Sequence, residues 1–320
     1  MAQSKPTLNL IGAGRVGQTL ARLWTQAGVF AVQDVLTRSP ASAQAACDFV
    51  GAGAPVAHLD AMRPADAWLF ATTDANIAAN AAALAAQAAK WPALALALAS
   101  SSPAHESGLA NAPPTAAQAD SPSFTAFHCS GALGADQLAP LAALGWHTAS
   151  AHPILSFATA EAACAQFAGT PCALEGDPVA RALLRDTFTA IGAQCFEVRS
   201  QDKLLYHAAA VFATNFLPVL QSVAEDTWRA TGVPEALLPH LRASLLNNAV
   251  ANITHLGPQG ALTGPAARGD IAAIARQAQA VGAWDEKAGD AYRALSALAL
   301  RLAGHGPATD GATGVGQRSD

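Results

Sequence analysis

A short apolar segment near the start of the chain runs directly into three closely spaced glycines. Residues 7–11 predict a buried strand, and Gly12, Gly14 and Gly17 follow in the pattern G-x-G-x-x-G, with helical apolar spacing from Val16 onward. The first glycine permits a tight turn, the second lets a ligand approach the backbone, and the third lets the helix pack against the strand. The helix N-terminus then points free N–H groups at phosphates. This order predicts a dinucleotide site with contacts from Gly12, Gly14, Arg15, Val16 and Gly17.

Composition restricts the class of protein. The 320 residues suffice for two domains, and 52% hydrophobic against 13% charged residues is typical of a compact, helix-rich chain. A net charge of −5 without a basic run argues against nucleic acid or a membrane surface as the partner. The five cysteines are scattered, no signal peptide is evident, and the alanine-rich stretch 75–89 is too short to span a bilayer. We therefore expect a soluble, cytoplasmic protein with reduced thiols.

The periodic segments predict two structural regions. Up to about residue 170, apolar strands alternate with helical patterns, which favours a parallel sheet covered on both faces. After residue 200, long helical patterns dominate, and Gly232 and Pro234 mark a stop and a restart. The expected strands cover 7–11, 31–37, 67–71, 93–99, 124–128 and 147–151, with a weaker one over 172–175 that leads into a helix over 178–190. The expected long helices cover 202–231, 234–255, 269–280 and 284–303.

The predicted fold class is therefore α/β. An N-terminal Rossmann domain with a doubly wound parallel sheet covers residues 1–170, and an all-helical C-terminal domain covers residues 171–303. The last stretch, 304–320, is rich in Gly, Ala and Thr without apolar periodicity, so we expect it to be a disordered tail.

The end of the second strand bears on which dinucleotide is bound. NAD enzymes place an acid there to accept hydrogen bonds from the ribose diol. Here the strand ends in Thr37, Arg38 and Ser39, whose hydroxyls and guanidinium suit a 2′-phosphate. This favours NADP(H). Asp34 is the competing acid and favours NAD if the strand ends three residues earlier.

Two further turns follow strands on the edge where the cofactor is expected. Thr72, Thr73 and Asp74 end one strand and begin a helix, so they are expected to line the cofactor cleft, although Asp74 is also a preferred N-cap residue. Ser101 follows the strand expected over 93–99, where a hydroxyl can reach the nicotinamide ribose.

Two histidines lie at or just beyond strand ends. His128, with Ser130 close by, follows one strand, and His152 follows the next. A single histidine at such a place is more often structural, but two on one edge indicate a candidate site for acid–base chemistry or substrate contact.

The helical pattern from 202 carries polar residues in an otherwise apolar segment. Lys203, Tyr206 and His207 are spaced i, i+3, i+4 and share a face, and Asn215 lies beside that face further along. A buried lysine and histidine require a polar cavity. Pro218 is expected to bend this helix, because it cannot donate to the carbonyl of Thr214. The alternative is that Lys203 and Tyr206 sit at an exposed helix start.

The turn over 262–270 joins two helices and is rich in polar residues. Thr263 and Arg268 can bind a substrate carboxylate or phosphate, whereas Asp270 can simply cap the next helix. The sequence shows no metal-ligand constellation, no G-x-S-x-G and no P-loop.

Taken together, these motifs resemble those of a bacterial family with a Rossmann-like N-terminal domain and a helical C-terminal domain of unknown function. The family belongs to the NADP oxidoreductase group that includes pyrroline-5-carboxylate reductase, 6-phosphogluconate dehydrogenase and the deazaflavin-dependent NADP reductases. The matching pieces are IGAGRVG at 11–17, LTRS at 36–39, ATTD at 71–74, HCSGAL at 128–133, AHPILSF at 151–157, KLLYHAAAVFATNF at 203–216 and LTGPAARGD at 262–270. The resemblance implies NADP(H) binding and a homodimer formed through the helical domain, but no substrate.

The functional prediction is reduction of a small C=O or C=N compound by NADPH, or the reverse oxidation. Lys203 is the first candidate to polarise the acceptor or donate the proton, by analogy with similar hydroxyacid dehydrogenases, and His152 or His207 is the alternative. Substrate contacts are expected from His128, Ser130, Asn215, Thr263 and Arg268. The competing hypothesis is a non-catalytic NADP(H)-binding sensor or assembly protein, and a deazaflavin or flavin as a second redox partner is a third.

Overall fold

A computed structural model describes residues 5–91 and 124–305 of the chain. The chain divides into two compact units, Met1–Phe212 and Ala213–Asp320, each described here by itself. The sequence prediction set its boundary at residue 170, whereas this division falls at 212/213, because two strands after residue 170 join the same sheet as the earlier ones. The expected strand over 93–99, Ser101 and nearly all of the predicted tail lie outside the described residues.

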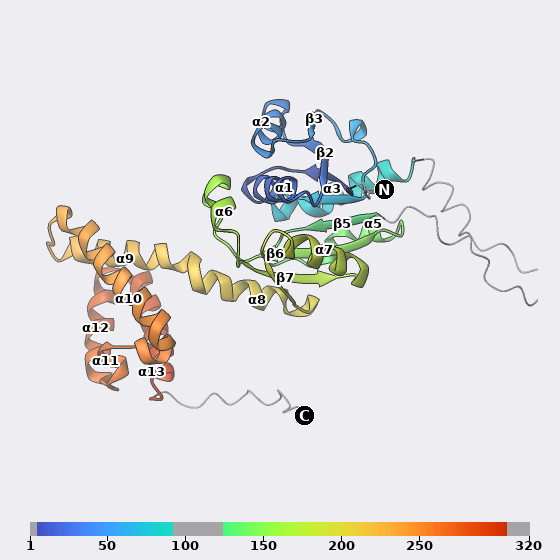
Figure 1. The fold of residues 1–320 in the computed structure, drawn as a ribbon. Helices are drawn as coiled ribbons and strands as arrows, with labels where there is room; N and C mark the ends of the chain where they lie inside the picture. Colours follow the sequence, from blue (N-terminus) through green and yellow to red (C-terminus); the bar gives the residue numbers. More distant parts are fainter. Residues whose placement is uncertain (1–4, 92–123, 306–320) are drawn as a thin grey trace, which may run out of the picture. The chain divides into compact units, whose positions relative to one another are not determined.

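The first unit is built on one eight-stranded sheet in the order β3-β2-β1-β4-β5-β6-β7-β8. The first six strands run parallel, and their order reverses between β1 and β4, which is the place where doubly wound sheets bind ligands (Figure 1). The strands are β1 Thr7–Ile11, β2 Ala31–Leu36, β3 Ala54–Val56, β4 Ala67–Phe70, β5 Thr125–His128, β6 His147–Pro153, β7 Pro171–Gly176 and β8 Gln194–Glu197.

The prediction of a parallel sheet holds only in part. Strand β7 pairs antiparallel with β6, and β8 pairs parallel with β7, so the last two strands run against the first six. The sequence prediction identified neither β3 nor β8, because each is a short strand with exposed positions that carries no clear apolar alternation.

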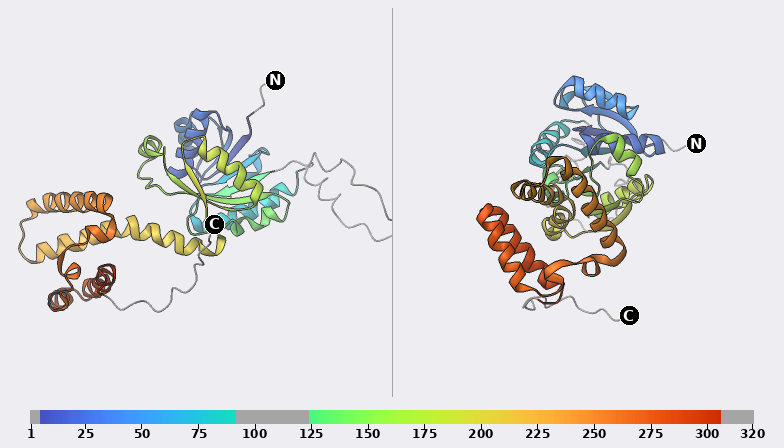
Figure 2. Two further views of the ribbon diagram at one scale, coloured as in Figure 1. Left: turned by 60° about the horizontal axis from the view of Figure 1, so that its bottom comes forward. Right: turned by 90° about the vertical axis from the view of Figure 1, so that its left-hand side faces the viewer.

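Helices cover both faces of this sheet. Helices α1 (Arg15–Ala27), α6 (Ala160–Gln166) and α7 (Pro178–Thr189) lie over one face, where Trp24 packs edge-on against Phe127 and Phe188. Helices α3 (Asp74–Ala88) and α5 (Ala139–Ala142) lie over the other, around Trp68 and Trp146 (Figures 1 and 2). Helix α2 (Pro40–Val50) follows β2, and α8 (Lys203–Ala210) ends the unit.

The long helical pattern expected over 202–231 is interrupted. A π-helical turn, Val211–Asn215, separates α8 from α9 (Phe216–Ala230), and Pro218 lies in the next turn. A proline in that position removes a backbone donor to the preceding turn, as the sequence predicted for Pro218. The π turn adds a residue to one helical turn and so ends the regular spacing assumed for Asn215.

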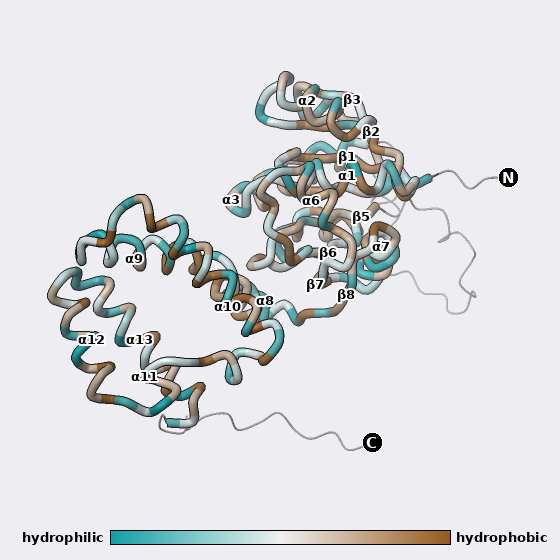
Figure 3. The backbone as a smooth tube through the Cα atoms, turned by 60° about the vertical axis from the view of Figure 1, so that its left-hand side comes forward, coloured by the Kyte–Doolittle hydropathy of each residue, from teal (hydrophilic) through white to brown (hydrophobic). Residues whose placement is uncertain are grey.

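The second unit is helical but has very little core. Its helices are α9, α10 (Leu238–Ala261), α11 (Gly264–Ala267), α12 (Ile271–Trp284) and α13 (Glu286–Leu302), of which α12 packs closely on α13. Hydrophobic residues recur along these helices (Figure 3). Many of their large apolar side chains are exposed. The residues that are buried are small apart from one leucine: Leu238, Ala266, Ala278, Ala288 and Gly289.

One segment of the described chain, Ser200–Ala230, is long and apolar enough to cross a membrane by length and composition. The sequence predicted a helix for this segment and not a membrane span. Its apolar stretch is not buried in the described structure, and Lys203 near its start is bonded to the first unit through Ser130 and Ser150.

Candidate functional site

The three glycines after β1 have the geometry expected of a phosphate-binding turn. Gly12 has a φ of +84°, and a Cβ there would lie 2.7 Å from the backbone of Ala71. A Cβ on Gly17 would lie 2.8 Å from the Cβ of Ala71, so the helix packs against the end of β4. Gly14 differs, because a Cβ there would meet nothing within 4 Å. It is the N-cap of α1 and faces open space, as a glycine beside a pyrophosphate must.

We expect Gly14→Ala to weaken cofactor binding without harming the fold. Its φ of −73° suits alanine and the space is free, so the melting temperature should stay unchanged. A methyl group where the phosphates approach should lower NADPH affinity by about tenfold or more. Fluorescence titration with NADPH measures this. Gly17→Ala is the matched contrast, because its crowded Cβ should lower the melting temperature. Equal NADPH affinity in Gly14→Ala and wild type would contradict this position for the phosphates.

The residues at the end of β2 bear on whether the cofactor is NAD(H) or NADP(H). Asp34 is buried and its carboxylate is held by Arg63, with 2.6 Å from Oδ1 to the guanidinium and 2.7 Å from Oδ2 to the main-chain N–H. It therefore stabilises the sheet and is not presented to a ribose. Thr37 and Ser39 lie beyond the strand, and the side chain of Ser39 caps α2 by accepting from Ser42 N. Arg38 between them is exposed.

The turn after β4 carries a polar atom without a partner. The hydroxyl of Thr72 is buried and has no hydrogen-bond partner among the described residues, and its methyl group lies beside Gly12. Thr73 is the N-cap of α3, so Asp74 is the first residue of that helix and not its cap. Asp74 instead accepts a 2.8 Å hydrogen bond from the Ser130 hydroxyl. An open Gly14, an unpaired Thr72 hydroxyl and a helix N-terminus fit a dinucleotide phosphate.

The loop after β5 is held in place by its own side chains. His128 is fully buried; its Nδ1 accepts from Ser130 N at 3.2 Å, so its Nε2 carries the proton and donates to Gly134 O at 2.8 Å. Burial lowers the pKa of His128, which keeps the ring neutral. The Ser130 hydroxyl accepts from the N–H groups of Ala132 and Leu133. His128 and Ser130 therefore shape this loop.

Lys203 is buried beneath the same loop. Only 2% of its surface is exposed, and its Nζ donates to Ser130 O at 3.0 Å and to Ser150 Oγ at 2.6 Å. Ser150 in turn donates to Glu175 Oε2 at 2.9 Å. Glu175 also accepts from Ala135 N at 2.8 Å and Ser200 Oγ at 2.6 Å. Burial lowers the pKa of Lys203, opposed by the Glu175 charge. The exposed helix start considered in the sequence analysis is thus not what the structure shows.

Two histidine rings meet at Gly131 in this loop. A Cβ on Gly131 would lie 2.3 Å from His207 Nδ1 and 2.9 Å from His152 Nε2, so only glycine leaves room for both rings. The rings are 5.7 Å apart and inclined by 72°. His152 Nδ1 is 2.8 Å from the Tyr206 hydroxyl. His207 Nδ1 is buried without a partner among the described residues.

The surroundings of His152 favour a neutral ring. Burial lowers the pKa of His152 to about 4, with a further contribution from His207 and Lys203. Burial raises the pKa of Tyr206, so its hydroxyl stays protonated. A neutral imidazole beside a protonated phenol can donate or accept one hydrogen bond toward a substrate without carrying a charge.

Comparisons with known proteins match two segments of the chain. Residues 7–92 match the family described as NADP oxidoreductase, coenzyme F420-dependent, and residues 170–299 match a domain of unknown function, DUF2520. The chain carries both of these domains. A search of curated proteins finds no match. His128 and His152 fall between the two matched segments, whereas Lys203, Tyr206 and His207 belong to the DUF2520 segment.

Solved structures share the fold at low sequence identity. Protein TM1727 from Thermotoga maritima is 21% identical, with a TM-score of 0.66, over 93% of this chain and 98% of its own. A proposed NADP oxidoreductase from Bacteroides fragilis is 18% identical, with a TM-score of 0.65, over 93% and 98%. An imine reductase variant from Myxococcus stipitatus, in complex with NAD+, is 17% identical, with a TM-score of 0.52, over 95% and 96%.

The DUF2520 segment also contains the predicted substrate residues of the second unit. The Asn215 side chain accepts from the Thr214 hydroxyl at 2.9 Å. Thr263 is the N-cap of α11, and Asp270 caps α12 by accepting from Ala273 N, as the sequence alternative stated. Arg268 is exposed and has no ion pair within the described residues. Asn215, Thr263 and Arg268 belong to the second unit, whereas His128, His152 and His207 belong to the first.

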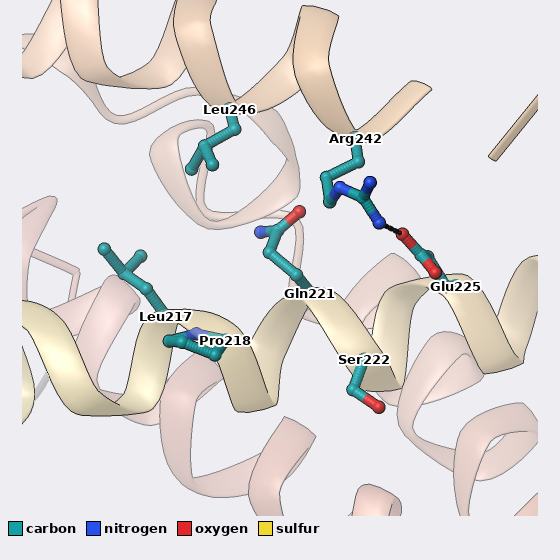
Figure 4. Close-up of a pocket in the computed structure, with 7 residues that line it drawn as sticks. All are labelled: Leu217, Pro218, Gln221, Ser222, Glu225, Arg242 and Leu246. Atoms are coloured by element: carbon teal, nitrogen blue, oxygen red, sulfur yellow. Dashed lines mark hydrogen bonds and ion pairs between the residues drawn. The ribbon is translucent and has the colours of Figure 1, made fainter. Parts of the chain in front are cut away.

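An open pocket of about 430 Å³ lies between helices α9 and α10 of the DUF2520 segment (Figure 4). Leu217, Pro218 and Leu246 line one end, and the ion pair of Arg242 with Glu225 lies at the other. A second cavity of about 260 Å³ adjoins Thr263 and Tyr292. Across residues 5–91 and 124–305, no group of three or more side chains could hold a metal ion.

Sequence reasoning missed three members of the site. Ser150, Glu175 and Gly131 were not singled out, although Tyr206 was placed on the face of Lys203. A serine and a glutamate at core-facing positions of apolar strands were the available signal, because a buried carboxylate requires donors nearby. Nothing in the sequence indicated Gly131, because glycine is required there only by the rings of His152 and His207, which are distant in the sequence.

Proposed function

We propose that the protein is an NADP(H)-dependent oxidoreductase that acts on a small C=O or C=N compound or on the corresponding alcohol or amine. The observation that carries the proposal is the meeting of His152 and His207 at Gly131. Gly131 follows the end of β5 and His152 lies in the last residues of β6; both strands run parallel to β1 and β4, so the two residues share the sheet edge of the glycine turn. The reductase neighbours support the same reaction class.

The protein's own groups supply binding, orientation and a proton. NADPH, when bound, supplies the hydride. In this proposal the Tyr206 hydroxyl donates to His152 Nδ1, which leaves the proton on Nε2. That Nε2–H polarises the acceptor oxygen or nitrogen as a neutral donor. Because Lys203 is bonded to Ser130 and Ser150, we assign it a positioning role that fixes the loop. His207 then bounds the other side of the acceptor, and the predicted substrate contacts of Asn215, Thr263 and Arg268 remain part of the proposal.

The proposed preference is for NADP(H) over NAD(H). Asp34 is occupied by Arg63, so the acid that would accept from a ribose diol is absent from the described end of β2. Arg38 is exposed there, flanked by the hydroxyls of Thr37 and Ser39, which suits a 2′-phosphate.

A homodimer through the second unit is also proposed. Exposed large apolar side chains occur on α9, α10 and α12, with Val219, Ile253 and Ile271 each at least half exposed. With five residues buried, the unit lacks a core that would stabilise it alone. A second copy of the same surface supplies the apolar contact area that is missing.

The test is a titration of the purified protein with NADPH and with NADH, following nicotinamide fluorescence, for wild type and Arg38→Ala. We expect NADPH to bind at least about tenfold more tightly than NADH, and Arg38→Ala to remove most of that difference. Binding of neither cofactor would overturn the proposal. Binding without turnover of any keto acid or cyclic imine would favour the sensor hypothesis.

A further inference from the structure

Two cysteines lie side by side at the outer edge of the sheet. Cys172 on β7 and Cys195 on β8 are direct partners in the parallel register of these strands. Adjacent strands are about 4.8 Å apart, and directly paired residues point to the same face. A Cα separation of that size falls within the range of about 4.4–6.8 Å that disulfides require. Both thiols pack in the core cluster beneath α7, on the face opposite to Glu175.

The two thiols differ in their surroundings. Cys172 is fully buried, whereas Cys195 is half-buried on the edge strand. The Cys195 sulfur faces Cys172 across the strand register, the Thr189 hydroxyl lies 4.0 Å from it, and the Arg185 carbonyl oxygen lies 3.9 Å from it. Arg185 lies nearby, and its guanidinium donates to Cys195 O at 3.3 Å. These donors and the arginine stabilise a thiolate on Cys195, and the Cys172 hydrogen bond is the main reason that its pKa falls to about 7. The same hydrogen bond and burial raise the pKa of Cys172.

We propose that Cys195 and Cys172 form a redox-active dithiol that reacts with hydrogen peroxide and closes to a reversible disulfide between β7 and β8. The Cys195 thiolate attacks one peroxide oxygen, the O–O bond breaks, and hydroxide leaves, which gives a sulfenic acid on Cys195. The sulfur of Cys172 then attacks the Cys195 sulfur and displaces the hydroxyl group, which leaves as water with the Cys172 proton. Two electrons pass from the dithiol to peroxide.

Two of the three other thiols of the described chain serve as internal controls; for the third, Cys129, burial raises the pKa to about 12. Burial raises the pKa of Cys47 and of Cys164, so both are protonated at neutral pH. Neither is paired with another cysteine in the strand register. At pH 7 Cys195 is about half thiolate, against a few per cent for an ordinary thiol, so it should react about tenfold faster than either control.

The experiment treats the full-length chain with hydrogen peroxide at pH 7 and reads intact mass and peptide maps over time. We expect a loss of two hydrogen atoms, a Cys172–Cys195 linked peptide, and full recovery with dithiothreitol. Cys172→Ser keeps a hydroxyl donor next to Cys195, and here we expect a sulfenic acid that a cyclic 1,3-diketone traps. Cys164→Ser should behave as wild type.

Two results would overturn the proposal. One is oxidation of Cys47 or Cys164 as fast as Cys195 in the wild-type chain. The other is a wild-type sulfenic acid on Cys195 that persists or overoxidises without forming the linked peptide. Neither depends on cofactor binding or on turnover, so the proposed oxidoreductase function is tested separately.

Discussion

His152→Gln is expected to lower turnover by about 10²–10³-fold while leaving NADPH affinity unchanged. The reason is that Nε2 is the proposed donor to the acceptor atom, and removal of one such preorganised donor typically costs this much. Glutamine keeps a polar group of similar reach toward Tyr206, so the site should stay folded. The measurement is the steady-state rate with a keto acid or cyclic imine found by screening, together with NADPH titration.

The pH profile and a matched variant sharpen this test. Because burial lowers the pKa of His152 to about 4, the wild-type rate should not show a step near pH 6.5 that arises from this residue. Below about pH 4 the ring becomes protonated and Tyr206 can no longer donate to it. His58→Gln is the control, since His58 precedes the short turn Leu59–Ala61 and is far in the sequence from Gly131 and His152. An unchanged rate in His152→Gln would remove His152 from the mechanism.

Lys203→Met is expected to lower the free energy of unfolding by about 3–5 kcal/mol. The substitution fills similar volume but removes the donor to Ser130 O and Ser150 Oγ, and it leaves the Glu175 carboxylate buried without a nearby cation. Chemical denaturation followed by tryptophan fluorescence measures the loss.

A second substitution distinguishes charge from packing. In Lys203→Met/Glu175→Gln the buried negative charge is also removed, so part of the lost stability should return. A double variant no more stable than the single one would show that Lys203 acts through packing. Full activity in Lys203→Met, with stability lowered, would support its positioning role over proton donation.

The parts of the fold that the sequence predicted are those governed by local pattern. The strand, glycine turn and helix over 7–27 follow from nearest-neighbour spacing, and so do the helix starts at Arg15, Asp74 and Pro178. The interruption of the helical pattern, a π turn over Val211–Asn215, lies just before Pro218, where the sequence predicted a disturbance from one missing N–H. From the helix turn predicted to carry them together, Lys203 contacts Ser130, His207 lies against Gly131, and Tyr206 contacts His152.

What the sequence could not predict depends on long-range pairing. The pattern of apolar residues in β7 is the same whether the strand runs parallel or antiparallel to β6, so the sequence could not predict its direction. The contact-based division at 212/213 differs from the predicted boundary at 170 for the same reason, because strands β7 and β8 join the sheet of the first unit. The Ser150 hydroxyl that links Lys203 to Glu175 joins residues from three separate elements, and single-sequence patterns carry no information on such contacts.

The scarcity of buried side chains in the second unit has a thermodynamic consequence. When a domain obtains its apolar contacts from another molecule, its unfolding equilibrium contains a concentration term. Dilution then shifts the balance toward the unfolded form by mass action, even at constant temperature and pH. The amount of protein in the cell would thereby become one of the quantities that determines how much of it is folded.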